Sequence, residues 1–159
     1  MSLPGQLLKI PGTETLGKIP GTDTYCDVGQ YPMALQIPGV LIIRIKSAWL
    51  CFANANSVRE RITRLLSEEE EDDAKKRTKV VVLDMSSLMN IDTSGIASLR
   101  ELHQKLVSEG MELVIVNPRW QVIHADFFSK IGVRIFLTVG EAISANFDID
   151  STTKMFPLK

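Results

Sequence analysis

Two hydroxyl groups, a carboxylate and a glycine come together at Asp92-Thr93-Ser94-Gly95, between an apolar run and a helical pattern. Asp, Thr and Ser are preferred helix N-caps, because their side-chain oxygens can accept hydrogen bonds from the N–H groups that the first helical turn leaves unpaired. The same N–H groups can solvate a phosphate, and phosphorylation of Thr93 or Ser94 would add about −1.5 to −2 charge. The segment therefore predicts either a cap alone or a cap that is also a phosphorylation switch, in which Asp92 would repel the added phosphate.

The other chemically reactive residues do not form a catalytic or metal-binding set. His103 and His124 fall on different predicted helices, without the clustered ligands that a metal site needs. Asp84 and Asp92 flank the central loop, but we expect Asp84 to end a strand and Asp92 to cap a helix. The sequence has no glycine-rich phosphate-binding motif, no GxSxG and no defensible Cys–His spacing. We therefore predict a non-enzymatic protein that needs no metal or other cofactor.

The elements that position this segment follow from hydrophobic periodicity. Residues 80–83 are a wholly apolar run, typical of a strand buried on both faces. From Ile96 apolar residues recur every three or four positions, which predicts a helix. Further strands are predicted at 40–44, 49–53, 111–116 and 133–137, and further helices at 54–66, 117–130 and 138–147.

The order of these elements predicts an α/β fold. Alternating strands and helices indicate a mostly parallel sheet, here of about five strands with about four helices. A leading hairpin, with residues 46–48 as its turn, would make the sheet mixed. Two capping boxes support helix starts, one from Ser57 and Glu60 and one from Thr138 and Glu141.

Composition divides the chain into a domain and two flanking segments. Residues 1–32 are rich in Pro-Gly turns and lack an apolar period, so we interpret them as an extended linker, its first residues being added for expression. Residues 33–147 form the domain. Within it, residues 67–78 form an acidic loop followed by bases, either a docking site for a basic partner or a tolerated surface insertion. Residues 148–159 are a tail without a pattern.

Charge and hydropathy exclude several classes of partner. The net charge of −1 and the lack of a basic patch with interleaved aromatics argue against nucleic acid. The chain has no apolar stretch near the roughly 20 residues that a membrane-spanning helix needs. Cys26 and Cys51 are the only cysteines, and we expect free thiols, with Cys51 buried, in a reducing, cytosolic setting.

The string LDMSSLMNIDTSGI, from Leu83 to Ile96, resembles the central motif of STAS domains, which occur in sulfate transporters and bacterial anti-sigma factor antagonists. The predicted order of elements is also similar to the STAS order. Further upstream, five short strings look like plant sulfate transporters of the SulP type: GKIPGT at 17–22, QYP at 30–32, PG at 38–39, FAN at 52–54 and RERI at 59–62. The STAS resemblance covers about residues 32–147.

The resemblance implies a cytosolic C-terminal domain that controls the activity, folding or trafficking of a sulfate transporter's membrane core. Residues 1–32 would connect that core to the domain, and the acidic loop would match a variable insertion of transporter STAS domains. In bacterial antagonists the phosphorylated hydroxyl immediately precedes the glycine, a position that Ser94 occupies here. In plant transporters the candidate regulatory hydroxyl comes one residue earlier, at Thr93.

The expected contact surface joins this loop to the exposed side of the helix that follows. It comprises Asn90, Asp92, Thr93, Ser94 and Gly95 in the loop, and Arg100, Glu101, Gln104 and Lys105 on the helix. The implied partners are the membrane domain of the same transporter and a cytosolic regulatory protein or kinase. A homodimer formed through the full-length transporter is also compatible with the resemblance. The domain would lie at the cytosolic face of a membrane, as part of a multi-pass protein.

Two alternatives remain open. One is a stand-alone antagonist that binds a kinase or anti-sigma factor and is switched at Ser94. The other is a nucleotide-binding module that uses the helix N-terminus at Gly95.

Overall fold

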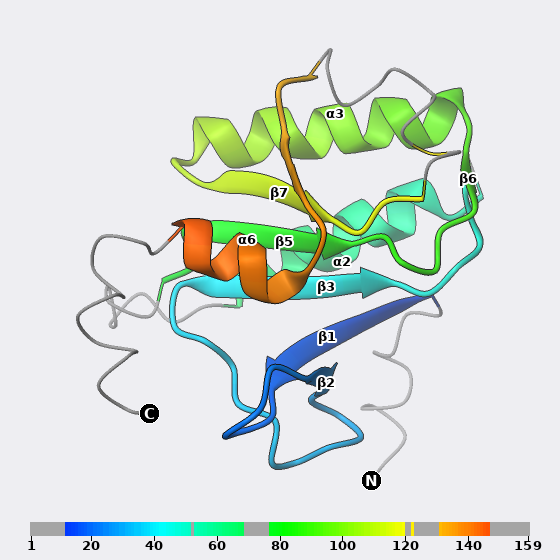
Figure 1. The fold of residues 1–159 in the computed structure, drawn as a ribbon. Helices are drawn as coiled ribbons and strands as arrows, with labels where there is room; N and C mark the ends of the chain where they lie inside the picture. The colour runs from blue at the N-terminus through cyan, green and yellow to red at the C-terminus, as the bar shows by residue number, and fades with distance from the viewer. Residues whose placement is uncertain (1–11, 52, 69–76, 120–121, 123–130, 147–159) are drawn as a thin grey trace, which may run out of the picture.

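The central strand of the sheet is the apolar run at residues 80–83 (Figure 1). It precedes the loop that carries Asp92, Thr93, Ser94 and Gly95, which we call the hydroxyl loop. The computed structural model describes residues 12–51, 53–68, 77–119, 122 and 131–146. Within them, a six-stranded sheet has the spatial order β2-β1-β3-β5-β7-β8, and a two-stranded sheet joins β4 to β6. The strands are β1 (Thr13–Lys18), β2 (Tyr25–Asp27), β3 (Val40–Ile45), β4 (Trp49–Leu50), β5 (Val80–Asp84), β6 (Asn90–Ile91), β7 (Glu112–Val116) and β8 (Arg134–Phe136).

Strand β5 lies at the centre because both of its faces and both of its edges are used. It pairs in parallel with β3 on one side and with β7 on the other. Every one of its residues is buried, and Val81 and Leu83 face one core while Val80 and Val82 face the other. A strand in this position cannot alternate apolar with polar residues, which explains its continuous apolar sequence.

Three described helices cover the sheet unequally. They are α2 (Ala55–Ser67), α3 (Thr93–Ser108) and α6 (Val139–Asn146). Helices α2 and α3 share the larger core, whereas α6 packs on the opposite face of the sheet (Figure 1). The α/β fold expected from the sequence, with its mixed and mostly parallel sheet, is confirmed. None of the helices in the described part of the chain is both long and apolar enough to cross a membrane.

The two predicted capping boxes have different outcomes. At the start of α6, the Glu141 N–H donates to Thr138 Oγ1 at 3.1 Å, and Glu141 Oε2 accepts from the Leu137 N–H at 3.1 Å. At the start of α2 the prediction is wrong, because the helix begins at Ala55 and so places Ser57 inside its first turn. Asn54 is the N-cap residue there, and its side chain bonds to the segment before the helix: Oδ1 accepts from the Cys51 N–H at 2.9 Å.

The predicted leading hairpin is also wrong. Strand β4 is only Trp49–Leu50, and it pairs in parallel with β6, with Trp49 opposite Asn90 and Leu50 opposite Ile91. The sheet is mixed for a different reason: β1 pairs antiparallel with both β2 and β3. Residues 46–50 therefore lead away from the main sheet toward the N-terminus of α3.

Strands β1 and β2 lie inside the segment that we interpreted as a linker without regular structure. The sheet thus extends to Thr13, well before the expected domain start at residue 33. Whether this arm also connects the domain to a membrane core stays a prediction. Residues 1–11, most of the acidic loop, the bulk of the predicted helix at 117–130 and the tail at 148–159 lie outside the described residues. Both cysteines are free thiols, but Cys51 is half-buried, not buried as expected.

A partly buried ion pair joins the carboxyl ends of two neighbouring strands. Arg44 on β3 and Asp84 on β5 are register partners, and Arg44 Nε donates to Asp84 Oδ2 at 3.0 Å. The Asp84 side chain is only 7% exposed, and its other oxygen accepts from the Ser86 N–H at 2.9 Å. Asp84 thus ends its strand as predicted, and it also anchors the start of the loop that leads to β6.

We predict that Asp84→Ala lowers the free energy of unfolding by about 2 kcal/mol, because it leaves the Ser86 N–H without its acceptor and removes the closer of the two carboxylates that pair with the partly buried Arg44, the other being Glu14 at 3.6 Å. The matched control is Glu112→Ala, which removes an ion pair to Arg134 between side chains that are 44% and 45% exposed. We expect the control to cost less than about 1 kcal/mol. Urea unfolding followed by circular dichroism measures both, and equal losses would contradict this account.

Candidate functional site

The hydroxyl loop lies beyond the carboxyl ends of β3 and β5, next to β6 and the start of α3 (Figure 1). Backbone hydrogen bonds hold it to the segment around β4. The N–H groups of Met89 and Asn90 both donate to the Ala48 carbonyl, at 2.7 and 3.0 Å. The Asp92 N–H donates to the Leu50 carbonyl at 3.1 Å. The loop that carries Thr93 and Ser94 is therefore fixed in place on both sides of β6.

Asp92 is the N-cap of α3, as the sequence predicts. Its Oδ1 accepts from the Gly95 N–H at 2.8 Å, and its carbonyl accepts from the Ile96 N–H at 2.9 Å. The carboxylate therefore satisfies one of the orphan N–H groups and places negative charge at the positive end of the helix dipole.

Gly95 allows the first turn of α3 to lie directly against β4. It is buried, and a Cβ at this position would lie 2.4 Å from the Leu50 carbonyl oxygen and 2.8 Å from Ile91 Cγ1. The Leu50 oxygen belongs to the backbone and cannot move aside cheaply. The glycine is thus required by packing and is not merely a residue that eases the turn.

Thr93 and Ser94 are the first two helical residues, and both are exposed. Neither hydroxyl forms a hydrogen bond with another residue of the described part of the chain. Their N–H groups belong to the first turn, where no intrahelical acceptor exists. Both hydroxyls are therefore accessible in this chain, and an anion beside them would meet a helix N-terminus together with the Asp92 carboxylate.

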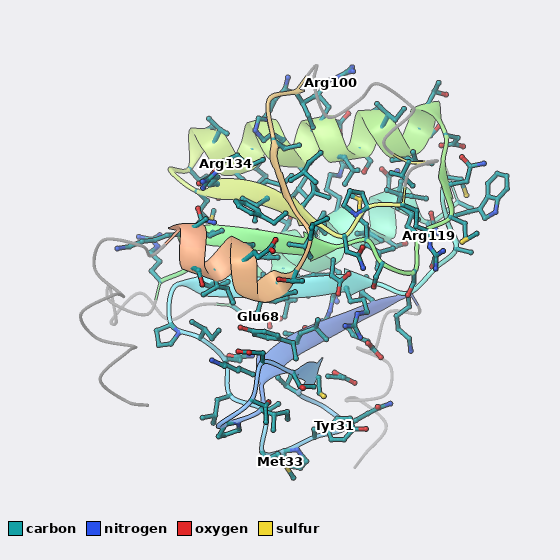
Figure 2. All side chains as sticks on the ribbon, viewed as in Figure 1. Tyr31, Met33, Glu68, Arg100, Arg119 and Arg134 are labelled. Carbon is teal, nitrogen blue, oxygen red and sulfur yellow. The ribbon has the colours of Figure 1, made fainter. Side chains whose placement is uncertain are left out.

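The predicted contact surface on α3 is exposed, but its members differ in availability. Arg100, Gln104 and Lys105 are exposed, and Figure 2 shows Arg100 on the outer side of α3. Glu101 forms an ion pair with Arg59 of α2. Its charge is therefore partly compensated within the domain, and it contributes more to joining the two helices than to attracting a partner.

Asn90 shares β6 with Ile91 and is exposed, although its side-chain oxygen accepts from the neighbouring Ile91 N–H at 2.8 Å. It stands opposite Trp49 in the β4–β6 register. Asn90, Thr93 and Ser94 are thus exposed and Asp92 is half-buried, whereas Gly95 is buried and adds nothing to the predicted contact surface. That a partner contacts this loop stays a prediction.

Two apolar residues beside this loop were missed from the sequence. The Trp49 side chain is 55% exposed and the Met89 side chain is 42% exposed. Trp49 alternates with the buried Leu50, so strand alternation could have placed its side chain outward. Exposed aromatic and Met side chains are typical of protein interfaces, and they add apolar contact area beside the hydroxyls.

No group of three or more His, Cys, Asp or Glu residues in the described ranges is arranged to hold a metal ion. His103 lies half-buried on α3, away from the loop, and His124 lies outside the described residues. The loop itself offers hydroxyls, one carboxylate and backbone N–H groups. Such a set can accept a charged modification or contact a partner, but it lacks a base positioned to activate a nucleophile.

Comparisons with known proteins fit this arrangement. The family model described as "STAS domain" matches residues 31–142. Sulfate transporter 2.1 of Arabidopsis thaliana is 57% identical over 148 residues, which cover 87% of this chain but 22% of that protein. The chain thus spans about a fifth of the length of this relative.

Two solved structures share the fold at low identity. The murine anion transporter Slc26a9 has a TM-score of 0.68 at 23% identity, covering 89% of this chain and 23% of that one. The anti-sigma factor antagonist SpoIIAA in its unphosphorylated form has a TM-score of 0.57 at 18% identity, covering 72% of this chain and 94% of that one. The antagonist matches over nearly its whole length, but the match leaves more of this chain uncovered than the match to the murine transporter does.

We predict that Gly95→Ala lowers the free energy of unfolding by about 2–3 kcal/mol, because the added methyl group forces α3 away from the Leu50 carbonyl. The control is Gly140→Ala in α6, where a new Cβ would lie 3.8 Å from Thr138 Oγ1, an ordinary van der Waals contact. We expect Gly140→Ala to be neutral or to stabilise by up to about 1 kcal/mol. Chemical denaturation compares the two variants, and a Gly95→Ala protein as stable as Gly140→Ala would refute the packing argument.

Proposed function

The chain belongs to the STAS domain family, and on this premise we propose that it is the cytosolic C-terminal regulatory domain of a plant-type sulfate transporter. The observation that carries the proposal is the 57% identity to a plant sulfate transporter over 87% of this chain. In this role the domain catalyses no reaction and transports nothing alone. It controls the activity, folding or trafficking of a membrane core that belongs to the same polypeptide.

The extent of the structural matches also favours a transporter domain over a stand-alone antagonist. The antagonist fold accounts for 72% of this chain, whereas the murine transporter accounts for 89%. The additional chain includes material that an antagonist can do without. A domain attached to a membrane core has a use for such material, because it needs a connection and a surface that faces the core.

The proposed regulatory site is the exposed pair Thr93 and Ser94. Phosphorylation of either would place about −1.5 to −2 charge at the N-terminus of α3, where unpaired N–H groups favour an anion. Asp92 opposes this gain, since its carboxylate occupies the cap and accepts from Gly95. The two effects act in opposite directions on stability, so the main result is a change of surface charge.

The proposed partners follow from the position of this surface. A kinase or another cytosolic regulatory protein would read the loop together with Arg100, Gln104 and Lys105, all exposed on the same helix. The membrane core would contact the domain elsewhere. In this proposal the domain lies at the cytosolic face of a membrane, within a multi-pass protein.

Four substitutions in the full-length transporter test the switch: Thr93→Ala, Thr93→Asp, Ser94→Ala and Ser94→Asp. We expect at least one Asp variant to change sulfate uptake or surface abundance several-fold, while the unfolding free energy of the 159-residue chain changes by less than about 1 kcal/mol. Uptake of labelled sulfate and surface biotinylation provide the two cellular readouts.

The control for these variants is Ser144, an exposed hydroxyl residue on α6 at the opposite face of the sheet. Ser144→Ala and Ser144→Asp should leave uptake and surface abundance unchanged. The switch proposal fails if all four loop variants match the wild type on both readouts.

A further inference from the structure

Three large apolar side chains project into solvent from a short segment beside the sheet edge, and we call them the apolar patch: Tyr31, Met33 and Leu35. They are 46%, 60% and 59% exposed. Figure 2 shows Tyr31 and Met33 near β2, at the opposite end of the view from Arg100 on α3. The apolar patch is therefore separate from the hydroxyl loop and from the predicted contact surface on α3.

The segment that carries the apolar patch is held firmly to β1. Lys18 and Leu35 exchange two backbone hydrogen bonds of 2.8 and 2.9 Å, and the Ala34 N–H donates to the Tyr31 carbonyl at 2.9 Å. Between the exposed side chains, Ala34 is only 9% exposed and serves as the buried anchor of the segment.

The close approach of this segment depends on a glycine in β1. A Cβ on Gly17 would lie 2.9 Å from the Leu35 carbonyl oxygen and 2.9 Å from Val28 Cγ1. The backbone of residues 34–35 therefore lies so close to β1 that only a glycine fits at position 17. These backbone contacts thus hold the three apolar side chains in a solvent-exposed position. In a loop without such contacts, the side chains could turn inward.

Isolated exposed apolar residues are ordinary on protein surfaces, but a held cluster indicates an interaction site. Gln30 and Gln36 flank the apolar patch and are exposed, which gives it the polar rim of an interface. The apolar patch also adjoins β2, the edge strand of the main sheet.

We infer that the apolar patch docks against the membrane core of the full-length transporter, an inference that rests on the proposed function. Its small size favours a tethered occupant over a freely diffusing one. A freely diffusing partner needs about 800 Å² of buried surface on each side for a stable complex, more than three side chains supply. A covalently tethered partner acts at an effective concentration in the millimolar range, so a small contact suffices.

The length of the relatives provides such a tethered partner. This chain corresponds to 22% of the plant sulfate transporter that it matches, so most of that polypeptide lies outside the domain. The domain would then have two functional sides, one bound to the core through the apolar patch and one left open for regulators at Thr93 and Ser94.

Cysteine labelling of the full-length transporter tests this docking. Met33→Cys reports on the apolar patch, and Val107→Cys on α3 is the control, because the two native side chains are 60% and 56% exposed. Cys26 and Cys51, which are half-buried, are first replaced by Ser. The labelling rate with a maleimide is measured for each variant in the 159-residue chain and in the detergent-solubilised transporter.

We expect Met33→Cys to label about tenfold more slowly in the transporter than in the 159-residue chain, as for a surface docked about nine-tenths of the time. Val107→Cys should label at the same rate in both. Leu35→Cys should repeat the Met33→Cys result if Met33→Cys disturbs folding.

Equal rates in the two proteins would overturn the inference. Concentration-dependent protection in the 159-residue chain would also overturn it, because a second copy would then be the occupant. Sulfate uptake by the parent transporter is measured in parallel. Unprotected Met33→Cys in a transporter that still takes up sulfate removes only the docking inference, whereas a parent that takes up no sulfate removes the proposed function itself.

Discussion

The contact between the first turn of α3 and the backbone of β4 determines the position of the Asp92–Gly95 loop. A side chain on Gly95 would come within 2.4 Å of the Leu50 carbonyl oxygen, so helix and strand are as close as a glycine permits. The same Leu50 carbonyl accepts from the Asp92 N–H, and Asp92 in turn caps the helix through Gly95. Thr93 and Ser94 therefore stand on a rigid platform, and a modification there alters charge without needing to move the backbone.

This platform depends on the central sheet for its own position. Strand β5 is buried on both faces and ends at Asp84, where the ion pair to Arg44 and the bond from the Ser86 N–H fix the direction of the departing chain. The chain then passes through the buried Met85 and Leu88 before it reaches β6. Because these anchors lie in the larger core shared by α2 and α3, the loop moves only if the core moves.

Sequence periodicity predicts the parts of this fold whose burial pattern is regular. The apolar run of β5, the repeat along α3 and the Thr138–Glu141 box all carry a local physical signal, and each appears as expected. Strand β1 carries none: in TETLGK, Leu16 is the only fully buried side chain, and the strand forms because β3 offers it an edge.

Strand partners are likewise not local information. Two short apolar runs separated by three residues suggest a hairpin, yet β4 pairs with β6, which lies some forty residues later in the chain. The same contrast between local and long-range information applies to the candidate site. The cap role of Asp92 and the exposure of both hydroxyls could be predicted, whereas the contact of Gly95 with Leu50 and the exposure of Met89 depend on that distant pairing.

The apolar neighbours of the loop explain how a charge can select between partners in the proposed role. Trp49 faces Asn90 across the β4–β6 pair and stays 55% exposed, so an unmodified loop offers an aromatic side chain beside neutral hydroxyls. A partner that buries Trp49 and Met89 would have to desolvate a phosphate on Thr93 or Ser94, which costs several kcal/mol unless a cation is supplied. A partner with an arginine at that point would gain a charge-assisted hydrogen bond instead. In the proposed role, the unmodified and the phosphorylated loop therefore exclude different partners as well as attract different ones. Exclusion of the wrong partner contributes to the specificity of a small surface.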